Sequence, residues 1–209
     1  MSTISDAQLG EIVHRVVQQY MLDTSSSSSG DTTTRSASPA SAPEPQPEAQ
    51  KKPNFGKAAI AIGADHGGFS LKEKVNKHLA ELGYNVTDCG AYNTQSVDYP
   101  DFAYAVAKMV SEGKAWRGIV IDGAGIGSCI VANKVPGVRA AMCYDHATAI
   151  NSREHNDANV LALGAGLIGE NLAMQIIDTW LMSEFLGGRH ARRVDKIVAI
   201  EKQFLKSEK

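Results

Sequence analysis

The chain has 209 residues, of which 43% are hydrophobic, and a formal net charge of −2. This balance is typical of a globular protein and excludes the strongly basic proteins that bind nucleic acid or anionic membranes through charge. No apolar run approaches the about 20 residues of a membrane span. Cys89, Cys129 and Cys143 are too far apart for a CxxC zinc or disulfide pattern. We therefore expect a cytoplasmic protein.

Residues 1–22 are expected to form an amphipathic helix. Polar side chains interrupt the apolar ones, so the segment lacks the unbroken apolar core of a secretory signal. Because one such helix is marginal alone in water, it is expected to pack on the body, to self-associate or, as we favour, to dock to another protein. Few basic residues argue against membrane adsorption. The helical stripe consists of Leu9, Ile12, Val13, Val16, Val17, Tyr20 and Met21.

Residues 23–54 are expected to form a disordered linker. Ser, Thr, Pro, Ala and Glu dominate this segment, so it cannot bury enough apolar surface to offset the entropy of ordering. A terminal amphipathic helix followed by such a linker resembles the encapsulation peptides that carry enzymes into bacterial microcompartments. That resemblance implies a shell protein as partner and a location inside a microcompartment.

Residues 55–209 are expected to form one α/β domain. Short apolar runs alternate with segments of helical period, and nearly continuous apolar strands are typical of a parallel sheet covered by helices on both faces. Ligands of such sheets bind beyond the carboxyl ends of the strands. The expected strands are 58–64, 84–90, 117–123, 138–144 and 158–164, and the helices are 70–82, 101–112, 127–134, 146–154, 169–183 and 191–206.

Polar residues follow the first two predicted strands. GADHGGF places Asp65 and His66 at a glycine-rich turn, and SVDYPDF places Asp98 and Tyr99 before a proline that can begin a helix. Each pair has a structural explanation, a helix cap or a turn, beside the functional one of a ligand site.

The segment VIDGAGIGSC contains Asp122 at a strand end, followed by Gly123, Gly125 and Gly127. It lacks the lysine of a Walker loop, and its GxGxG spacing differs from the GxGxxG of dinucleotide-binding proteins. A glycine turn between a strand and a helix still offers backbone N–H groups, which could stabilise a developing oxyanion.

Two further polar segments lie toward the C-terminus. SREHNDAN contains His155 and Asn156 just before a strand, where they could simply form a capped loop. GGRHARR contains Arg189 and Arg193, which could bind an anion such as a phosphate or lie on a helix surface.

Five motifs carry a resemblance to a known family. They are GADHGGFSLKEKV, DYPDFA, GAGIGSCIVANKVPGVRAAMC, SREHNDANVLALG and GGRHARRVDKI, in the family's order over residues 57–205. Together they resemble ribose-5-phosphate isomerase B, a family that includes galactose-6-phosphate isomerase subunits. The resemblance implies an aldose–ketose isomerase of phosphorylated sugars with a three-layer αβα, Rossmann-like fold and a five-stranded parallel sheet. It also implies a homodimer or tetramer with shared active sites, and no metal or cofactor.

The resemblance assigns a role to each candidate residue. His155 would open the sugar ring, with Asp65 contacting sugar hydroxyls. The remaining residues would bind the substrate. Asn156 and the loop of Gly123, Gly125 and Gly127 would bind the enediolate oxygens, and Asp98 and Tyr99 would line the sugar site. The phosphate would be bound by His66, Arg189 and Arg193.

The chain departs from the family pattern in three respects: the base, a threonine and an arginine. Asp122 stands where many members have a cysteine base, and Ser128 where another branch has a glutamate base. Ala124 replaces a threonine, and Gly166 replaces a phosphate-binding arginine. Asp122 could serve as the base if its apolar surroundings raise its pKa. Otherwise it caps the loop, and the protein is an isomerase of another aldose phosphate, such as a hexose 6-phosphate, or a non-catalytic binding protein. Cys129 is expected to pack within a helix.

Overall fold

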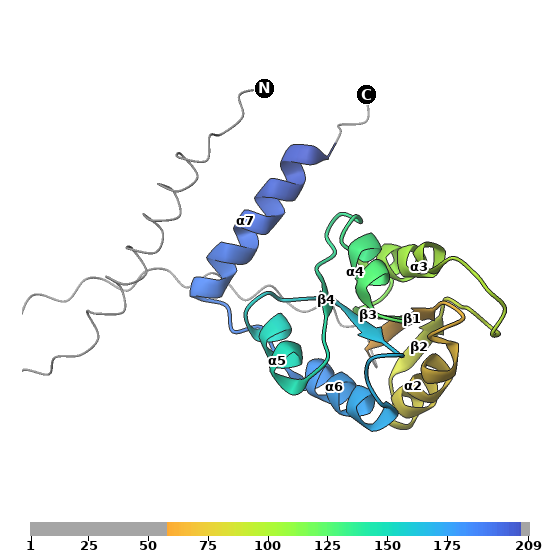
Figure 1. Cartoon of the computed structure of the whole chain (residues 1–209). Coiled ribbons are helices and arrows are strands. Elements are labelled where there is room, and N and C mark those ends of the chain that lie inside the picture. The colour runs from red at the N-terminus through yellow and green to blue at the C-terminus, as the bar shows by residue number, and fades with distance from the viewer. Residues whose placement is uncertain (1–57, 206–209) are drawn as a thin grey trace, which may run out of the picture. The chain divides into compact units, whose positions relative to one another are not determined.

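The computed structural model describes residues 58–205, so the predicted helix at 1–22 and the linker at 23–54 lie outside the described residues. Five strands form one parallel sheet in the order β2-β1-β3-β5-β4 (Figure 1). They are β1 (Ala59–Ala64), β2 (Asn85–Asp88), β3 (Arg117–Asp122), β4 (Ala140–Met142) and β5 (Val160–Gly164).

The three central strands explain why the sheet forms. Every residue of β3 and β5 is buried, as are all but one of β1, so these strands can lie only between two layers of helices. In the register of β3 and β5, Gly118 pairs with Val160 and Asp122 with Gly164. Residues after Asp122 therefore lie at the carboxyl edge of the sheet, and residues before Val160 lie at the amino edge.

Helices cover both faces of the sheet, as Figure 1 shows. One apolar core joins the sheet to α2, α5 and α6, and a second core joins its other face to α3 and α4. The helices are α2 (Phe69–Glu81), α3 (Tyr99–Ser111), α4 (Ile126–Ala132), α5 (His146–Glu154), α6 (Glu170–Met182) and α7 (Arg189–Phe204). The predicted three-layer αβα class is confirmed.

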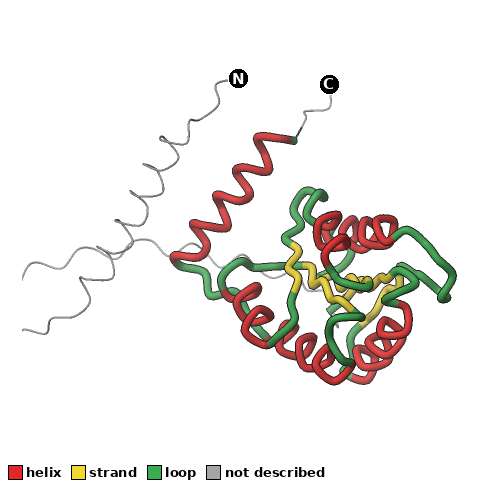
Figure 2. The backbone as a smooth tube through the Cα atoms, in the orientation of Figure 1, coloured by secondary structure: helices red, strands yellow, loops and turns green. Residues whose placement is uncertain are grey.

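The differences from the predicted elements lie at their ends. The edge strands β2 and β4 are shorter than the predicted 84–90 and 138–144 because each has only one neighbouring strand. Helix α3 begins two residues earlier than predicted, with Pro100 in its first turn, where a missing N–H costs nothing. The connection from β2 to α3 is a long loop (Figure 2).

Helix α7 follows Gly187 and Gly188, which both have positive φ, and it contacts the body near its start and near its end. Near its start, the His190 ring stacks on the ring of His155; near its end, Glu201 accepts a hydrogen bond from the backbone N–H of Gly137. Between and beyond these contacts it exposes large apolar side chains: Ile197, Ile200 and Phe204. No helix within residues 58–205 is long and apolar enough to cross a membrane.

Candidate active site

Glycines bring the loops after β1, β3 and β5 together at the carboxyl edge. A Cβ atom on Gly68 would lie 2.3 Å from the carbonyl oxygen of Ile121, and one on Gly164 would lie 2.5 Å from that of Ala124. Any side chain at either position would push the backbones apart. The loops that carry Asp65 and Asp122 can therefore meet only because these positions are glycine.

The Asp122 carboxylate lies inside the loop that follows it. Oδ1 accepts hydrogen bonds from the backbone N–H groups of Ala124, at 2.8 Å, and Gly125, while Oδ2 accepts one from Ser128 at 3.0 Å. Gly125 has φ +79°, a conformation that lets the loop fold back on the carboxylate. The backbone N–H groups of the glycine loop thus bind an anion, but this anion is the side chain of Asp122; the binding of an enediolate by this loop stays a prediction.

These hydrogen bonds reverse the pKa shift expected for Asp122. Its side chain is 5% exposed, and burial alone would raise the pKa. The hydrogen bonds from Ser128, Gly125 and Ala124 favour the ionised form more strongly, so the pKa lies below its ordinary value. The expectation that apolar surroundings raise this pKa is wrong, because the Ser128 side chain and the backbone N–H groups of the turn form hydrogen bonds to the carboxylate.

Asp65 and His66 shape the loop after β1. Asp65 is buried, and its Oδ1 accepts a hydrogen bond of 2.9 Å from the backbone N–H of Gly68, where α2 begins. The ring of His66 accepts a hydrogen bond from the backbone N–H of Val97 through Nδ1, at 3.2 Å. His66 therefore ties this loop to the segment that precedes α3.

Asp98 and Tyr99 lie where α3 begins. Asp98 is the N-cap residue of α3, yet its side chain makes no capping hydrogen bond and is exposed. The Tyr99 ring covers Gly127, since a Cβ atom on Gly127 would lie 2.6 Å from two ring carbons. The structure thus places both predicted sugar-lining residues beside the glycine loop.

His155, Asn156, Arg189 and Arg193 form a second group, between the end of α5 and the start of α7. The His155 ring lies parallel to that of His190, with the centroids 4.1 Å apart. Asn156 and both arginines are exposed. The backbone N–H of Leu186 donates to the carbonyl oxygen of Glu154 at 3.1 Å, which holds the two segments together.

The two groups lie at opposite edges of the sheet. Asp122 ends β3 at the carboxyl edge, whereas His155 precedes Val160, the first residue of β5, at the amino edge. The stretch of β3 from Gly118 to Asp122 alone spans about 13 Å. Within one chain the predicted site residues therefore form two separate groups, which we call the half-sites of the predicted site. They are the Asp122 group, with Asp65, His66, Asp98 and Tyr99, and the His155 group, with Asn156, Arg189 and Arg193.

A match to a known family model identifies the family of this chain. The model described as Ribose/Galactose Isomerase matches residues 60–197. The chain belongs to the ribose/galactose isomerase family.

Named relatives within this family cover the folded part of the chain. Ribose-5-phosphate isomerase B of Escherichia coli is 46% identical over 144 residues, which are 69% of this chain and 97% of the relative. D-erythrulose-4-phosphate isomerase of Pectobacterium atrosepticum is 47% identical over 146 residues, 69% of this chain and 96% of the relative. The solved structure of Clostridium thermocellum ribose-5-phosphate isomerase B has 55% identity and a TM-score of 0.69, over 70% of this chain and 99% of the other.

The structure shows the surroundings of Gly166, where the family pattern has an arginine, and of Cys129, which follows the glycine loop. At Gly166 the backbone N–H donates to the carbonyl oxygen of Gly123 at 2.9 Å, and a Cβ atom would lie 3.0 Å from that oxygen. Cys129 packs against a core cluster, and burial raises the pKa of its thiol, which fits a packing residue. No cluster of three or more His, Cys, Asp or Glu that could hold a metal occurs among residues 58–205.

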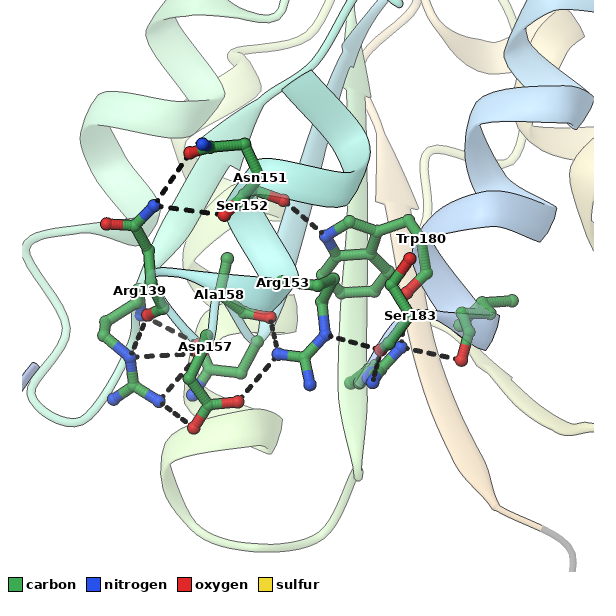
Figure 3. Close-up of polar contacts among 12 residues, drawn as sticks. Arg139, Asn151, Ser152, Arg153, Asp157, Ala158, Trp180 and Ser183 are labelled. Atoms are coloured by element: carbon green, nitrogen blue, oxygen red, sulfur yellow. Dashed lines mark hydrogen bonds and ion pairs between the residues drawn. The ribbon is translucent and has the colours of Figure 1, made fainter. Parts of the chain in front are cut away.

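Sequence analysis missed the residues that support His155 and Asn156. Asp157 has φ 46°, and its carboxylate binds Arg139 at 2.9 Å and Arg153 at 2.8 Å (Figure 3). Arg153 is buried and donates to the carbonyl oxygen of Ala158 as well. The spacing of four residues from Arg153 to Asp157 is a helical pair signal that could have been found. Arg139 lies too far from Asp157 along the sequence for their ion pair to be predicted.

Proposed function

We propose that this chain is an aldose–ketose isomerase that interconverts ribose 5-phosphate and ribulose 5-phosphate. The observation that carries the proposal is the meeting of Asp65, Asp98, Tyr99 and Asp122 at the carboxyl edge of the sheet. The relatives named ribose-5-phosphate isomerase B support the choice of substrate. In this reaction a base takes the C2 proton as an enediolate forms, and the proton then returns at C1, leaving a ketone at C2.

Asp122 is the proposed base. Its carboxylate lies at the end of β3, where Oδ1 accepts two of the three backbone hydrogen bonds and Oδ2 accepts the third. Because those bonds lower its pKa, Asp122 is a weaker base than a carboxylate poised near neutral pH. We therefore expect a modest kcat, and activity that persists in mild acid.

We further propose that a complete site needs two copies of the chain. His155 cannot reach Asp122 in its own chain, because the two half-sites lie at opposite edges of the sheet. A homodimer, alone or within a tetramer, can place the His155 group of one copy against the Asp122 group of the other. The exposed apolar residues Ile197, Ile200 and Phe204 of α7 support such an association.

In the shared site each group has one task. His155 would open the sugar ring and Asp65 would contact its hydroxyls. Asn156 and those N–H groups of the glycine loop that do not bind Asp122 would bind the enediolate oxygens. The phosphate would lie between His66 and the two arginines, Arg189 and Arg193. Binding energy from the phosphate orients the reacting end of the sugar.

The direct test is an isomerase assay with a panel of tetrose, pentose and hexose phosphates. Asp122→Asn should lower kcat with ribose 5-phosphate by at least about 10²-fold, the contribution of a positioned base. Asp145→Asn is the matched control, because Asp145 also accepts a backbone hydrogen bond, from Thr148 at 2.7 Å, but caps α5. Unchanged activity of Asp122→Asn would reject Asp122 as the base.

Another aldose phosphate is a second candidate substrate. Ala124 and Gly166 remove two side chains expected to contact the anionic groups of the substrate, and the Pectobacterium relative is named for a four-carbon ketose phosphate. The panel separates the candidates by kcat/KM.

A non-catalytic sugar-phosphate-binding protein is the third candidate. The observation that favours it is the use of the Asp122 carboxylate as a loop cap. This candidate predicts a higher Tm with ribose 5-phosphate and no turnover of any member of the panel.

We also propose that residues 1–22 carry the enzyme into a bacterial microcompartment. Their amphipathic period and the linker at 23–54 support this proposal. Deleting residues 1–22 should abolish co-purification with shell proteins and leave isomerase activity intact. Undiminished co-purification would reject the shell-docking role.

A further inference from the structure

Two asparagine side chains form a directed hydrogen-bond chain that ends on His155. Asn156 Nδ2 donates to the backbone carbonyl oxygen of Asn151 at 3.2 Å and to its Oδ1 at 3.2 Å. Asn151 Nδ2 lies 2.8 Å from His155 Nδ1. Asn151 precedes His155 by four residues, so both side chains lie on the same face at the end of α5.

The backbone carbonyl sets the direction of this chain. A carbonyl oxygen only accepts hydrogen bonds, so the atom of Asn156 that faces it is the amide nitrogen, which then donates to Asn151 Oδ1 as well. The other end of the Asn151 amide is therefore Nδ2, which only donates. His155 Nδ1 must accept from it, so a neutral His155 carries its proton on Nε2.

His190 fixes the plane of the same ring. The two imidazoles are parallel within 5°, and His190 is only 6% exposed. His190 Nε2 accepts a hydrogen bond from Arg189 Nε at 3.3 Å. Burial and the charges of neighbouring groups lower the pKa of His190, which favours the neutral form of this ring. With one face covered and Nδ1 engaged, Nε2 is the ring nitrogen that remains for a substrate.

We propose that Asn151 is a positioning residue that holds neutral His155 in the Nε2–H form, so that His155 acts on a sugar as a proton donor. The inference rests on the proposed function for its chemistry. The bond between C1 and the ring oxygen breaks, its electron pair stays on that oxygen, and the oxygen takes the Nε2 proton. The C1 hydroxyl gives its proton to water as the aldehyde forms, and water returns a proton to Nε2.

The test combines a direct view of the tautomer with kinetics. In ¹⁵N-histidine-labelled full-length protein, two-bond ¹⁵N–¹H correlations report which nitrogen of neutral His155 carries the proton, with the signals assigned through His155→Asn. Wild type should show the Nε2–H form. Asn151→Asp is nearly isosteric but accepts a hydrogen bond where the amide donated, so it should show the Nδ1–H form at a pH where His155 is neutral.

The kinetic arm uses the same variant at the same pH. With ribose 5-phosphate, Asn151→Asp should lower kcat at least tenfold and leave KM within about twofold, since the substitution changes a proton position and not a binding contact. Ala147→Asp is the control, because it adds the same charge to an exposed position one turn earlier on α5, out of reach of His155.

The outcomes separate the two levels of the proposal. An Nδ1–H tautomer in wild type, or an unchanged kcat in Asn151→Asp, overturns the role of Asn151. A loss of kcat in Ala147→Asp as large as in Asn151→Asp also overturns it, because the loss would then follow from charge. No turnover of any sugar phosphate by wild type rejects the proposed function, while the NMR result still decides which nitrogen of His155 carries the proton.

Discussion

The imidazole rings of His155 and His190 lie parallel, with centroids 4.1 Å apart, although the two residues belong to different helical segments. His190 is buried, and its Nδ1 has no hydrogen-bond partner in the structure. The contact with His155 therefore uses the face of the His190 ring, while His190 Nε2 accepts a hydrogen bond from Arg189. It joins the end of α5 to the start of α7 at the second half-site.

His190→Phe should preserve the function of this contact, and His190→Ala should not. Phenylalanine keeps a flat ring against His155 and removes the buried Nδ1, which lacks a partner. It also removes Nε2, the acceptor for the exposed Arg189. Alanine leaves the His155 ring free to turn. We expect kcat/KM with ribose 5-phosphate within about threefold of wild type for phenylalanine and at least tenfold lower for alanine. Equal losses of kcat/KM in the two variants would contradict this prediction, because they would show that histidine itself is required at position 190.

Asp122→Asn should lower stability at neutral pH. Asparagine has one accepting atom in place of two, so the backbone N–H of Ser128 would face an amide nitrogen. Leaving such a buried donor without an acceptor costs about 1–3 kcal/mol. Urea denaturation of both proteins at pH 7 measures the difference.

The effect of Asp122 on stability should also depend on pH in a defined direction. Its folded pKa lies below its ordinary value, so its contribution is present above the pKa of the unfolded chain. That contribution is lost as the pH falls through the folded pKa. The stability difference between wild type and Asp122→Asn should therefore be constant from pH 5 to 8 and shrink below about pH 4. A difference that grows in acid would contradict this account.

Asp157→Asn should destabilise the turn that carries His155 and Asn156. Asparagine tolerates the positive φ of this position but cannot form ion pairs with Arg139 and Arg153. Arg153 is buried, so removing its partner leaves a poorly compensated charge. Since Asp157 itself is partly exposed, we expect a loss of about 2 kcal/mol, less than for a fully buried pair. Chemical denaturation of the two proteins checks it.

Gly68→Ala should be severely destabilising, and Gly169→Ala should be nearly neutral. The new methyl group at position 68 would lie 2.3 Å from the carbonyl oxygen of Ile121, whereas nothing lies within 4 Å of a Cβ atom at Gly169. Both glycines are N-cap residues with negative φ, so the pair separates crowding from conformational freedom. Thermal unfolding should show a large fall in Tm for the first variant only.

Gly166→Arg tests whether the missing arginine of the family pattern limits phosphate binding. Its Cβ atom would lie 3.0 Å from the carbonyl oxygen of Gly123, a tight contact that requires the loop to move by a few tenths of an ångström. We expect KM for ribose 5-phosphate to fall about tenfold, because a charge-assisted hydrogen bond of this kind is worth about 1.5–3 kcal/mol. A KM equal to that of wild type would mean that the phosphate binds elsewhere.

Local patterns were enough to predict the layers of the fold. The apolar runs of β1, β3 and β5 are buried on both faces, and the helical periods between them correspond to α2–α6. The ends of β2 and β4 were less predictable, since an edge strand extends only as far as its single neighbour pairs with it.

The chain by itself determined the α/β class, the glycine turns that let strand-end loops meet, and the residue types available for proton transfer and phosphate binding. These follow from short-range periodicity and from what each side chain can donate or accept. Only the tertiary structure decided that the Asp122 carboxylate is enclosed by its own loop, that His155 lies at the opposite edge of the sheet, and that Asn151 donates to it. The first and third depend on where backbone N–H groups and an amide nitrogen point, and the second depends on how the strands and α5 are arranged. Spacing along a sequence encodes neither.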